Sequence, residues 1–149
     1  MARIRKLALL RLMVLVGLAV VLITWGVRYT LMGDPFQLSQ VIVCEDLDEK
    51  LQPLNPNSTF PYGSRQLCLT FNYQGAHEGD RLRIEWVHQE RLIYQENVSL
   101  ASGNGNKVFY LLKEDATPLP PGKHRVSIDL NGRQRARVEF TVEPPRRGS

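Results

Sequence analysis

Residues 66–87 read QLCLTFNYQGAHEGDRLRIEWV, and the fold class follows most directly from this segment. Every second side chain is apolar in residues 66–73, and the alternation returns in residues 81–87, where Trp86 belongs to the apolar set. A period of two is typical of a strand that buries one face. Two glycines separate the segments and indicate a turn. The stretch therefore predicts two strands that contribute their apolar faces to a core, with Trp86 as its anchor.

Five further segments have strand character: residues 37–44, 92–100, 107–112, 123–130 and 133–142. Asn131-Gly132 is a favoured two-residue hairpin turn, whereas residues 102–106 (SGNGN) indicate a longer turn. Strands spaced about 10–15 residues apart, with no helical period between them, favour an antiparallel sandwich. The sequence therefore predicts an all-β domain of seven antiparallel strands over residues 38–143, followed by a tail at 144–149.

Two motifs resemble a known family. The pattern Gly79-Asp80-x-Leu82-x-Ile84-x-Trp86 resembles the third strand of an immunoglobulin-like domain with its core tryptophan. The run from Pro121-Gly122 to Val138-x-Phe140-x-Val142 resembles the closing hairpin of bacterial extracytoplasmic immunoglobulin-like modules. The resemblance covers about residues 38–143. It implies an immunoglobulin-like sandwich, membrane-anchored in many such modules, that serves as a binding or accessory domain.

The two cysteines favour one disulfide if the domain is exported. Cys44 ends the first predicted strand and Cys68 lies in the second, so the bridge would close the acidic, proline-rich connection at 45–63. Both precede Trp86, whereas the cysteines of antibody domains flank the tryptophan, so an inter-sheet bridge does not follow from the resemblance. Cys68 is on the polar face of its strand, which places the expected bridge outside the core or at a sheet edge. Two free buried thiols are the alternative.

The N-terminus predicts a membrane span. Residues 12–27 (LMVLVGLAVVLITWGV) contain no charge, and residues 7–10 extend the apolar segment to 21 positions if Arg11 is tolerated. At 1.5 Å per residue, 21 residues reach roughly 32 Å, enough to cross a hydrocarbon core of about 30 Å. Four basic residues precede or open the segment, and only Arg28 closely follows it. This asymmetry predicts a cytoplasmic N-terminus and a periplasmic or extracellular domain.

We therefore expect a cytoplasmic stub and signal-anchor helix over residues 1–32, in a plasma or inner membrane, and a linker at 33–37. The alternative is a cleaved signal peptide with residues 12–23 as its apolar core. Its best cleavage site, residues 24–26 (TWG), is a poor match to the small-x-small pattern.

The formal net charge of +4 belongs to the N-terminus. Residues 1–33 contain five bases and no acid, which leaves 14 bases against all 15 acids in the remainder. A nucleic-acid-binding domain would be basic, so we expect no nucleic-acid partner. The three histidines lack metal-ligand spacing, and no nucleophile motif is present, so we expect no metal, cofactor or catalytic site. The acidic residues at 45–49 are interpreted as a solvated loop rather than a calcium site.

Two Asn-x-Ser/Thr triplets, at Asn57 and Asn97, are meaningful only in a glycosylating pathway, which the sequence does not establish.

Basic side chains gather on one predicted face. In an immunoglobulin-like sandwich the third, sixth and seventh strands are neighbours. Their outward positions include seven bases and three acids. We assign the candidate partner-binding surface to Arg81, Arg83, Lys123, Arg125, Arg135 and Arg137. A solvated face with cross-strand ion pairs is the simpler interpretation, and a docking face for an acidic protein partner is the functional one.

Two functions are compatible with these observations. The first is a non-catalytic accessory or binding module on a single span, serving a larger membrane complex through a protein partner. The second is a secreted or periplasmic ligand-binding domain or small enzyme released by cleavage. The second requires a pocket with convergent polar groups, and no small-molecule substrate can be identified from the sequence.

Overall fold

The computed structural model describes residues 14, 16–17, 19–23 and 36–146. The chain divides into two compact units, Met1–Pro35 and Phe36–Ser149. The described residues of the first unit are helical. Across the described ranges, no helix combines the length and apolar character needed to cross a membrane. The membrane span predicted at residues 12–27 lies in part outside those ranges.

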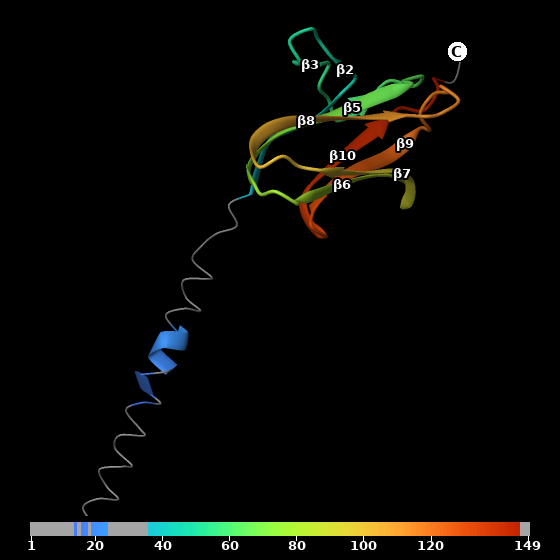
Figure 1. Ribbon diagram of the computed structural model, residues 1–149. Helices are drawn as coiled ribbons and strands as arrows, with labels where there is room; N and C mark the ends of the chain where they lie inside the picture. Colours follow the sequence, from blue (N-terminus) through green and yellow to red (C-terminus); the bar gives the residue numbers. More distant parts are fainter. Residues whose placement is uncertain (1–13, 15, 18, 24–35, 147–149) are drawn as a thin grey trace, which may run out of the picture. The chain divides into compact units, whose positions relative to one another are not determined.

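Ten strands build the second unit (Figure 1). They are β1 (Gln37–Cys44), β2 (Asp46–Leu47), β3 (Pro53–Leu54), β4 (Thr59–Phe60), β5 (Gln66–Ala76), β6 (Arg81–His88), β7 (Arg91–Ser99), β8 (Gly103–Leu112), β9 (Gly122–Leu130) and β10 (Arg133–Val142). The seven expected strands correspond to β1 and β5 to β10. The turn predicted at residues 102–106 is instead part of β8 from Gly103 onward, because this segment pairs with the end of β5.

The strands form two packed sheets and a small ribbon. One sheet has the order β1-β5-β8, the other has the order β4-β10-β9-β6-β7, and β2 pairs with β3. All neighbours are antiparallel except β4, which runs parallel to β10. Strands β6, β9 and β10 are neighbours, as predicted. The topology defines an immunoglobulin-like or fibronectin-like β-sandwich of ten strands rather than seven.

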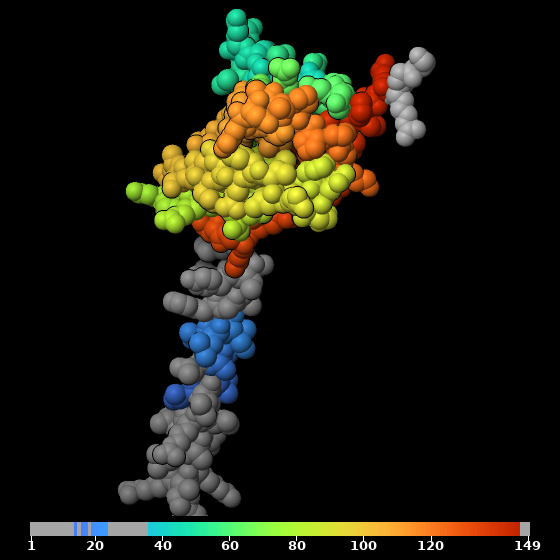
Figure 2. All heavy atoms as spheres, turned by 90° about the vertical axis from the view of Figure 1, so that its right-hand side faces the viewer, coloured from blue at the N-terminus to red at the C-terminus, as the bar shows by residue number. Residues whose placement is uncertain are grey.

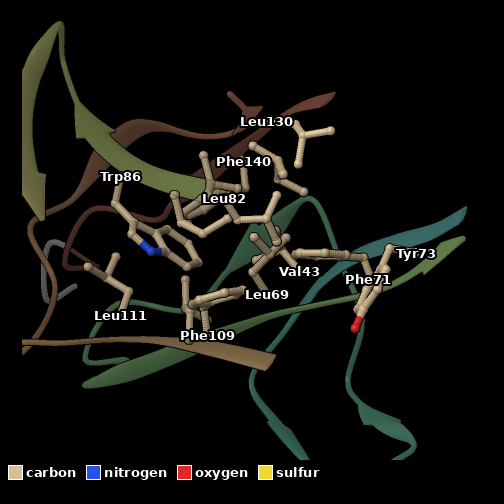
Figure 3. Packing of buried hydrophobic residues seen from close by; sticks show 14 of the residues in the cluster. Val43, Leu69, Phe71, Tyr73, Leu82, Trp86, Phe109, Leu111, Leu130 and Phe140 are labelled. Atoms are coloured by element: carbon tan, nitrogen blue, oxygen red, sulfur yellow. The ribbon is translucent and has the colours of Figure 1, made fainter. Parts of the chain in front are cut away.

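The core lies between the two sheets and contains twenty buried apolar residues of the described chain. Figure 3 shows labelled side chains from both sheets filling this space. Trp86 of β6 is fully buried, and its ring meets the edge of Phe140 with centroids 6.0 Å apart. Phe71 and Phe109 of the other sheet stack at 5.9 Å. Burial of such side chains is the main favourable contribution to folding.

The β9–β10 hairpin explains where several polar side chains point. Asn131 and Gly132 both have positive φ, as the favoured two-residue turn requires. A bulge then interrupts β10, because Gln134 pairs with Asp129 whereas Ala136 pairs with Ile128. Arg135 is the extra residue between them. A bulge shifts the alternation of side chains by one position, so the outward residue before it is Gln134.

Candidate partner-binding surfaces

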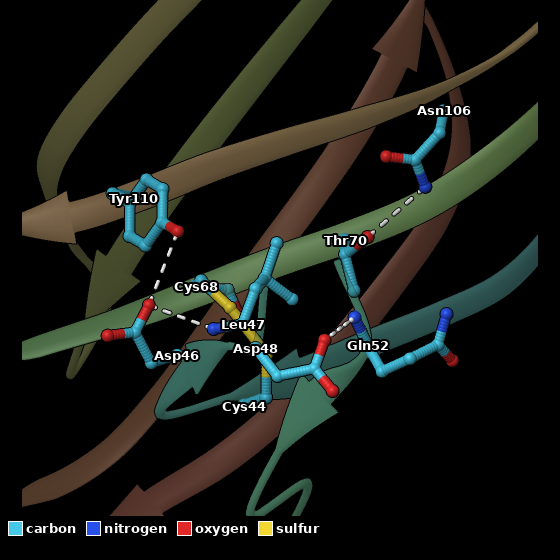
Figure 4. The surroundings of a disulfide bond; sticks show 9 residues. All are labelled: Cys44, Asp46, Leu47, Asp48, Gln52, Cys68, Thr70, Asn106 and Tyr110. Atoms are coloured by element: carbon cyan, nitrogen blue, oxygen red, sulfur yellow. Dashed lines mark hydrogen bonds between the residues drawn. A yellow bond between two sulfur atoms is a disulfide. The ribbon is translucent and has the colours of Figure 1, made fainter. Parts of the chain in front are cut away.

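The disulfide lies outside the core, on the outer face of the three-stranded sheet. Cys44 and Cys68 are directly opposite each other on β1 and β5, with Cα atoms 5.3 Å apart, and their sulfurs are bonded. Both cysteines are nevertheless fully buried. Figure 4 shows the reason, since the β2–β3 ribbon lies over the bridge. The prediction of a disulfide is confirmed, and this bridge joins neighbouring strands of one sheet.

The acidic residues of this ribbon are used in its own turns. Asp48 Oδ1 accepts hydrogen bonds from the backbone N–H groups of Lys50 and Gln52, both at 2.8 Å. Asp46 Oδ1 accepts a hydrogen bond from the Tyr110 hydroxyl at 3.4 Å (Figure 4). Partial burial of the phenol, followed by the nearby Asp46 carboxylate, raises the pKa of Tyr110. Within the described ranges, no group of three or more histidine, cysteine or acidic side chains could hold a metal ion.

Two histidines that are far apart in the sequence meet at one end of the sandwich. The rings of His88 and His124 are 4.5 Å apart, and their Nε2 atoms lie 2.9 and 2.8 Å from the carbonyl oxygens of Pro121 and Pro120. His124 is buried and also stacks on Phe140. Burial lowers the pKa of His124, with a smaller contribution from His88, against the raising effect of the Pro120 hydrogen bond. The two rings therefore form part of the packing at this end, where burial favours the neutral form of His124.

The basic side chains on the outer face of β6, β9 and β10 are mostly paired with acids. Arg83 lies 3.3 Å from Asp129 and 3.4 Å from Glu85. Arg125 lies 3.3 Å from Glu90. Ion pairs at exposed positions contribute about 0–1 kcal/mol each, so they stabilise the fold only slightly. They do reduce the positive charge that an acidic partner would meet.

Arg137 is paired in the same way, with Glu139 on its own strand. Arg81 and Lys123 are exposed, and neither has an ion-pair partner within the described part of the chain. A groove of about 330 Å³ crosses this face, and its lining includes Lys123, Arg125 and Arg137 together with Glu90. Its charge is therefore mixed.

Arg135 does not belong to this surface. Because it is the extra residue of the β10 bulge, its guanidinium lies over the ring of Phe36, 5.6 Å from the ring centroid. Such a cation–π contact holds the side chain against the start of the domain. The prediction that Arg135 shares a face with Arg137 is wrong, because strict alternation along residues 133–142 does not allow for the bulge.

A second surface, which was not predicted, exposes large apolar side chains beside charged ones. Strands β7 and β8 each lie at one edge of a sheet, since β7 pairs only with β6 and β8 only with β5 in the described chain. A groove of about 520 Å³ lies between them. Its lining combines the apolar side chains of Ile93, Tyr94, Leu111 and Leu112 with Pro120 and the charged residues that follow β8, which are Lys113, Glu114 and Asp115.

Large hydrophobic side chains are exposed along these two edges. They are Leu92 (50% exposed), Ile93 (37%), Tyr94 (41%), Tyr110 (41%) and Leu112 (51%). Figure 2 shows this side of the domain, with β7 in yellow beside the orange segment that follows β8. Gathered apolar groups on a surface are typical of interaction sites, whereas single ones are common everywhere. We call the surface formed by these five residues the apolar edge.

The sequence matches no protein-family model and no curated protein. Among solved structures, a β-glucosidase from Listeria innocua in complex with glucose is 15% identical over 73% of this chain, with a TM-score of 0.47, and the match spans only 16% of that protein. An immunoglobulin-like protein from Pseudomonas aeruginosa is 16% identical, with a TM-score of 0.44, and the match covers 73% of this chain and 92% of that one. These values concern the fold only, and no activity of those proteins is transferred to this chain.

Proposed function

We propose that this protein is a non-catalytic binding module, carried on a single N-terminal membrane span, which engages a protein partner outside the membrane. The observation that carries the binding function is the apolar edge. Five large hydrophobic side chains are exposed on the edge strands β7 and β8, and three of them, Ile93, Tyr94 and Leu112, line one groove between these strands. Water disfavours such a surface, so covering it with another protein would be favourable.

The apolar edge supports partner binding better than the basic face does. Arg83, Arg125 and Arg137 already have acidic partners within the domain. Binding an acidic protein there would exchange existing ion pairs for new ones, with little net gain. On the apolar edge, by contrast, the side chains of Leu92 and Leu112 remain about half exposed to water in the single chain.

Truncation of the apolar edge tests the binding function. The variant L92S/L112S, in full-length protein purified in mild detergent, should lose its bound partner. The matched control is L51S/L54S, which alters two exposed leucines on the β2–β3 side of the domain. Because all four leucines are exposed, both variants should unfold like the wild type. Retention of every partner by L92S/L112S would contradict the proposal.

The membrane span is supported by the uncharged stretch at residues 12–27 and the excess of basic residues before it. A spanning helix resists extraction by high salt and alkaline carbonate. The full-length protein should therefore stay with membranes under both treatments. Release of a protein whose first residue is Val27 would instead show cleavage of a signal peptide.

A further inference from the structure

We infer that the β7 part of the apolar edge, Leu92–Tyr94, binds a second copy of this chain, with the two β7 strands side by side and antiparallel. The inference rests on the proposed function, since it names the partner for the same surface. It is carried by two charged residues of β7, Arg91 and Glu96, which flank the exposed segment Leu92–Tyr94. In one register of an antiparallel pair of identical strands, these two charges meet each other.

The register of β7 against β6 shows that the two charged residues share a face. Side chains of directly opposed residues in a sheet point to the same side. Arg91 is opposite His88 and Glu96 is opposite Ile84, and Ile84 and His88 alternate onto the core side of β6. Five positions separate Arg91 from Glu96, which would place them on opposite faces of a regular strand. Ile93 is the extra residue of a bulge between Leu92 and Tyr94, the partners of Val87 and Trp86, and this bulge brings Arg91 and Glu96 back to the same face.

Neither charge is satisfied by the described residues of its own chain. Among the described residues, no ion pair involves Arg91 or Glu96 and neither side chain takes part in a hydrogen bond. Glu96 is nevertheless half-buried. A guanidinium within reach would form a charge-assisted hydrogen bond with this carboxylate.

A two-fold axis between Ile93 and Tyr94 satisfies both chains together. It places Arg91 opposite Glu96 of the second copy, and Glu96 opposite the second copy's Arg91. The same register sets Leu92 against Gln95, both on the outer face, and brings Leu92–Tyr94 of the two chains together. The arrangement is closed, because each copy uses its β7 edge once. It also covers the exposed edge, which is otherwise open to uncontrolled pairing.

Charge reversal tests this register. Self-association of the full-length protein is measured by sedimentation equilibrium in density-matched detergent. R91E and E96R should each weaken the dimer at least about tenfold, since two like-charge contacts arise across a two-fold axis. The double variant R91E/E96R should recover dimerisation. R133E and E78R, which reverse exposed charges elsewhere, should have no effect.

Disulfide capture tests the geometry independently of any association through the N-terminal segments. L92C mixed with Q95C should form a cross-linked dimer under mild oxidation, whereas either variant alone should form little. The proposal of a second copy as the partner would be refuted if the wild-type protein stays monomeric. It would also be refuted if neither R91E nor E96R changes the stability of the dimer. If L92S/L112S still loses a different protein in that case, the binding function stands. If it loses nothing, the binding function fails too.

Discussion

Replacing Trp86 by alanine tests the packing on which the sandwich depends. The side chain is fully buried and lies against Phe140. An aromatic side chain buries about 150–250 Å², and at about 25 cal/mol per Å² this corresponds to roughly 4–6 kcal/mol. The indole N–H is buried without a hydrogen-bond partner among the described residues, which offsets about 1 kcal/mol or more. We therefore expect Trp86→Ala to lower the free energy of unfolding by about 3–5 kcal/mol, as large-to-small core changes do.

Urea unfolding of the full-length protein, followed by circular dichroism, measures this effect. A small domain has only about 5–15 kcal/mol in total, so W86A should be largely unfolded at low urea. W86F keeps an aromatic ring and removes the unpaired N–H, so its loss should be clearly smaller. L51A, at an exposed position, serves as the control. An unfolding midpoint of W86A equal to that of the wild type would show that Trp86 does not stabilise the core.

Three further predictions concern the disulfide, the buried histidine and the basic face. Replacing Cys44 and Cys68 by serine should lower the free energy of unfolding in urea by about 3–4 kcal/mol, because the bridge closes a loop of 24 residues. An unchanged unfolding midpoint would contradict this. The pKa of His124 is lowered below 6.5, so the folded state favours the neutral ring. Stability should therefore fall as the pH drops below about 6.5, because the unfolded chain then binds a proton more readily than the folded one. An NMR titration of His124 with a midpoint at or above 6.5 would disprove this. R83Q/R125Q should change unfolding by less than about 1 kcal/mol and leave partner capture intact, whereas a salt-sensitive loss of the partner would assign binding to the basic face.

The alternating apolar pattern was sufficient to predict the main strands. In β5, β6 and β9 each apolar position of the pattern lies on the core side, because one face of each sheet is buried. The three short strands were missed for a physical reason. Two-residue strands have no period, and the β2–β3 ribbon depends on hydrogen bonds such as those of Asp48 with the turn that follows it. The disulfide is buried because that ribbon covers it, so its burial could not be predicted from the sequence either.

The partner-binding surface was harder to predict, because bulges change the face on which a side chain lies. Strict alternation placed Arg135 on the outer face, whereas the bulge turns it toward Phe36. The bulge in β7 likewise obscured its pattern. The run Leu92–Tyr94, three apolar residues in a polar segment, was the available signal. Its meaning depends on β7 being an edge strand, and that is a property of the sheet order rather than of the local sequence.

Footprinting of tyrosines in native membranes tests the central claim, that the apolar edge is covered by a protein partner. Tyr94 on this edge and Tyr62 outside it are both exposed in the single chain, at 41% and 51%. Both should therefore react with a tyrosine-labelling reagent in isolated, dilute protein. In native membranes, Tyr94 should become protected while Tyr62 stays reactive. Equal labelling of the two tyrosines in membranes and in dilute protein would contradict it.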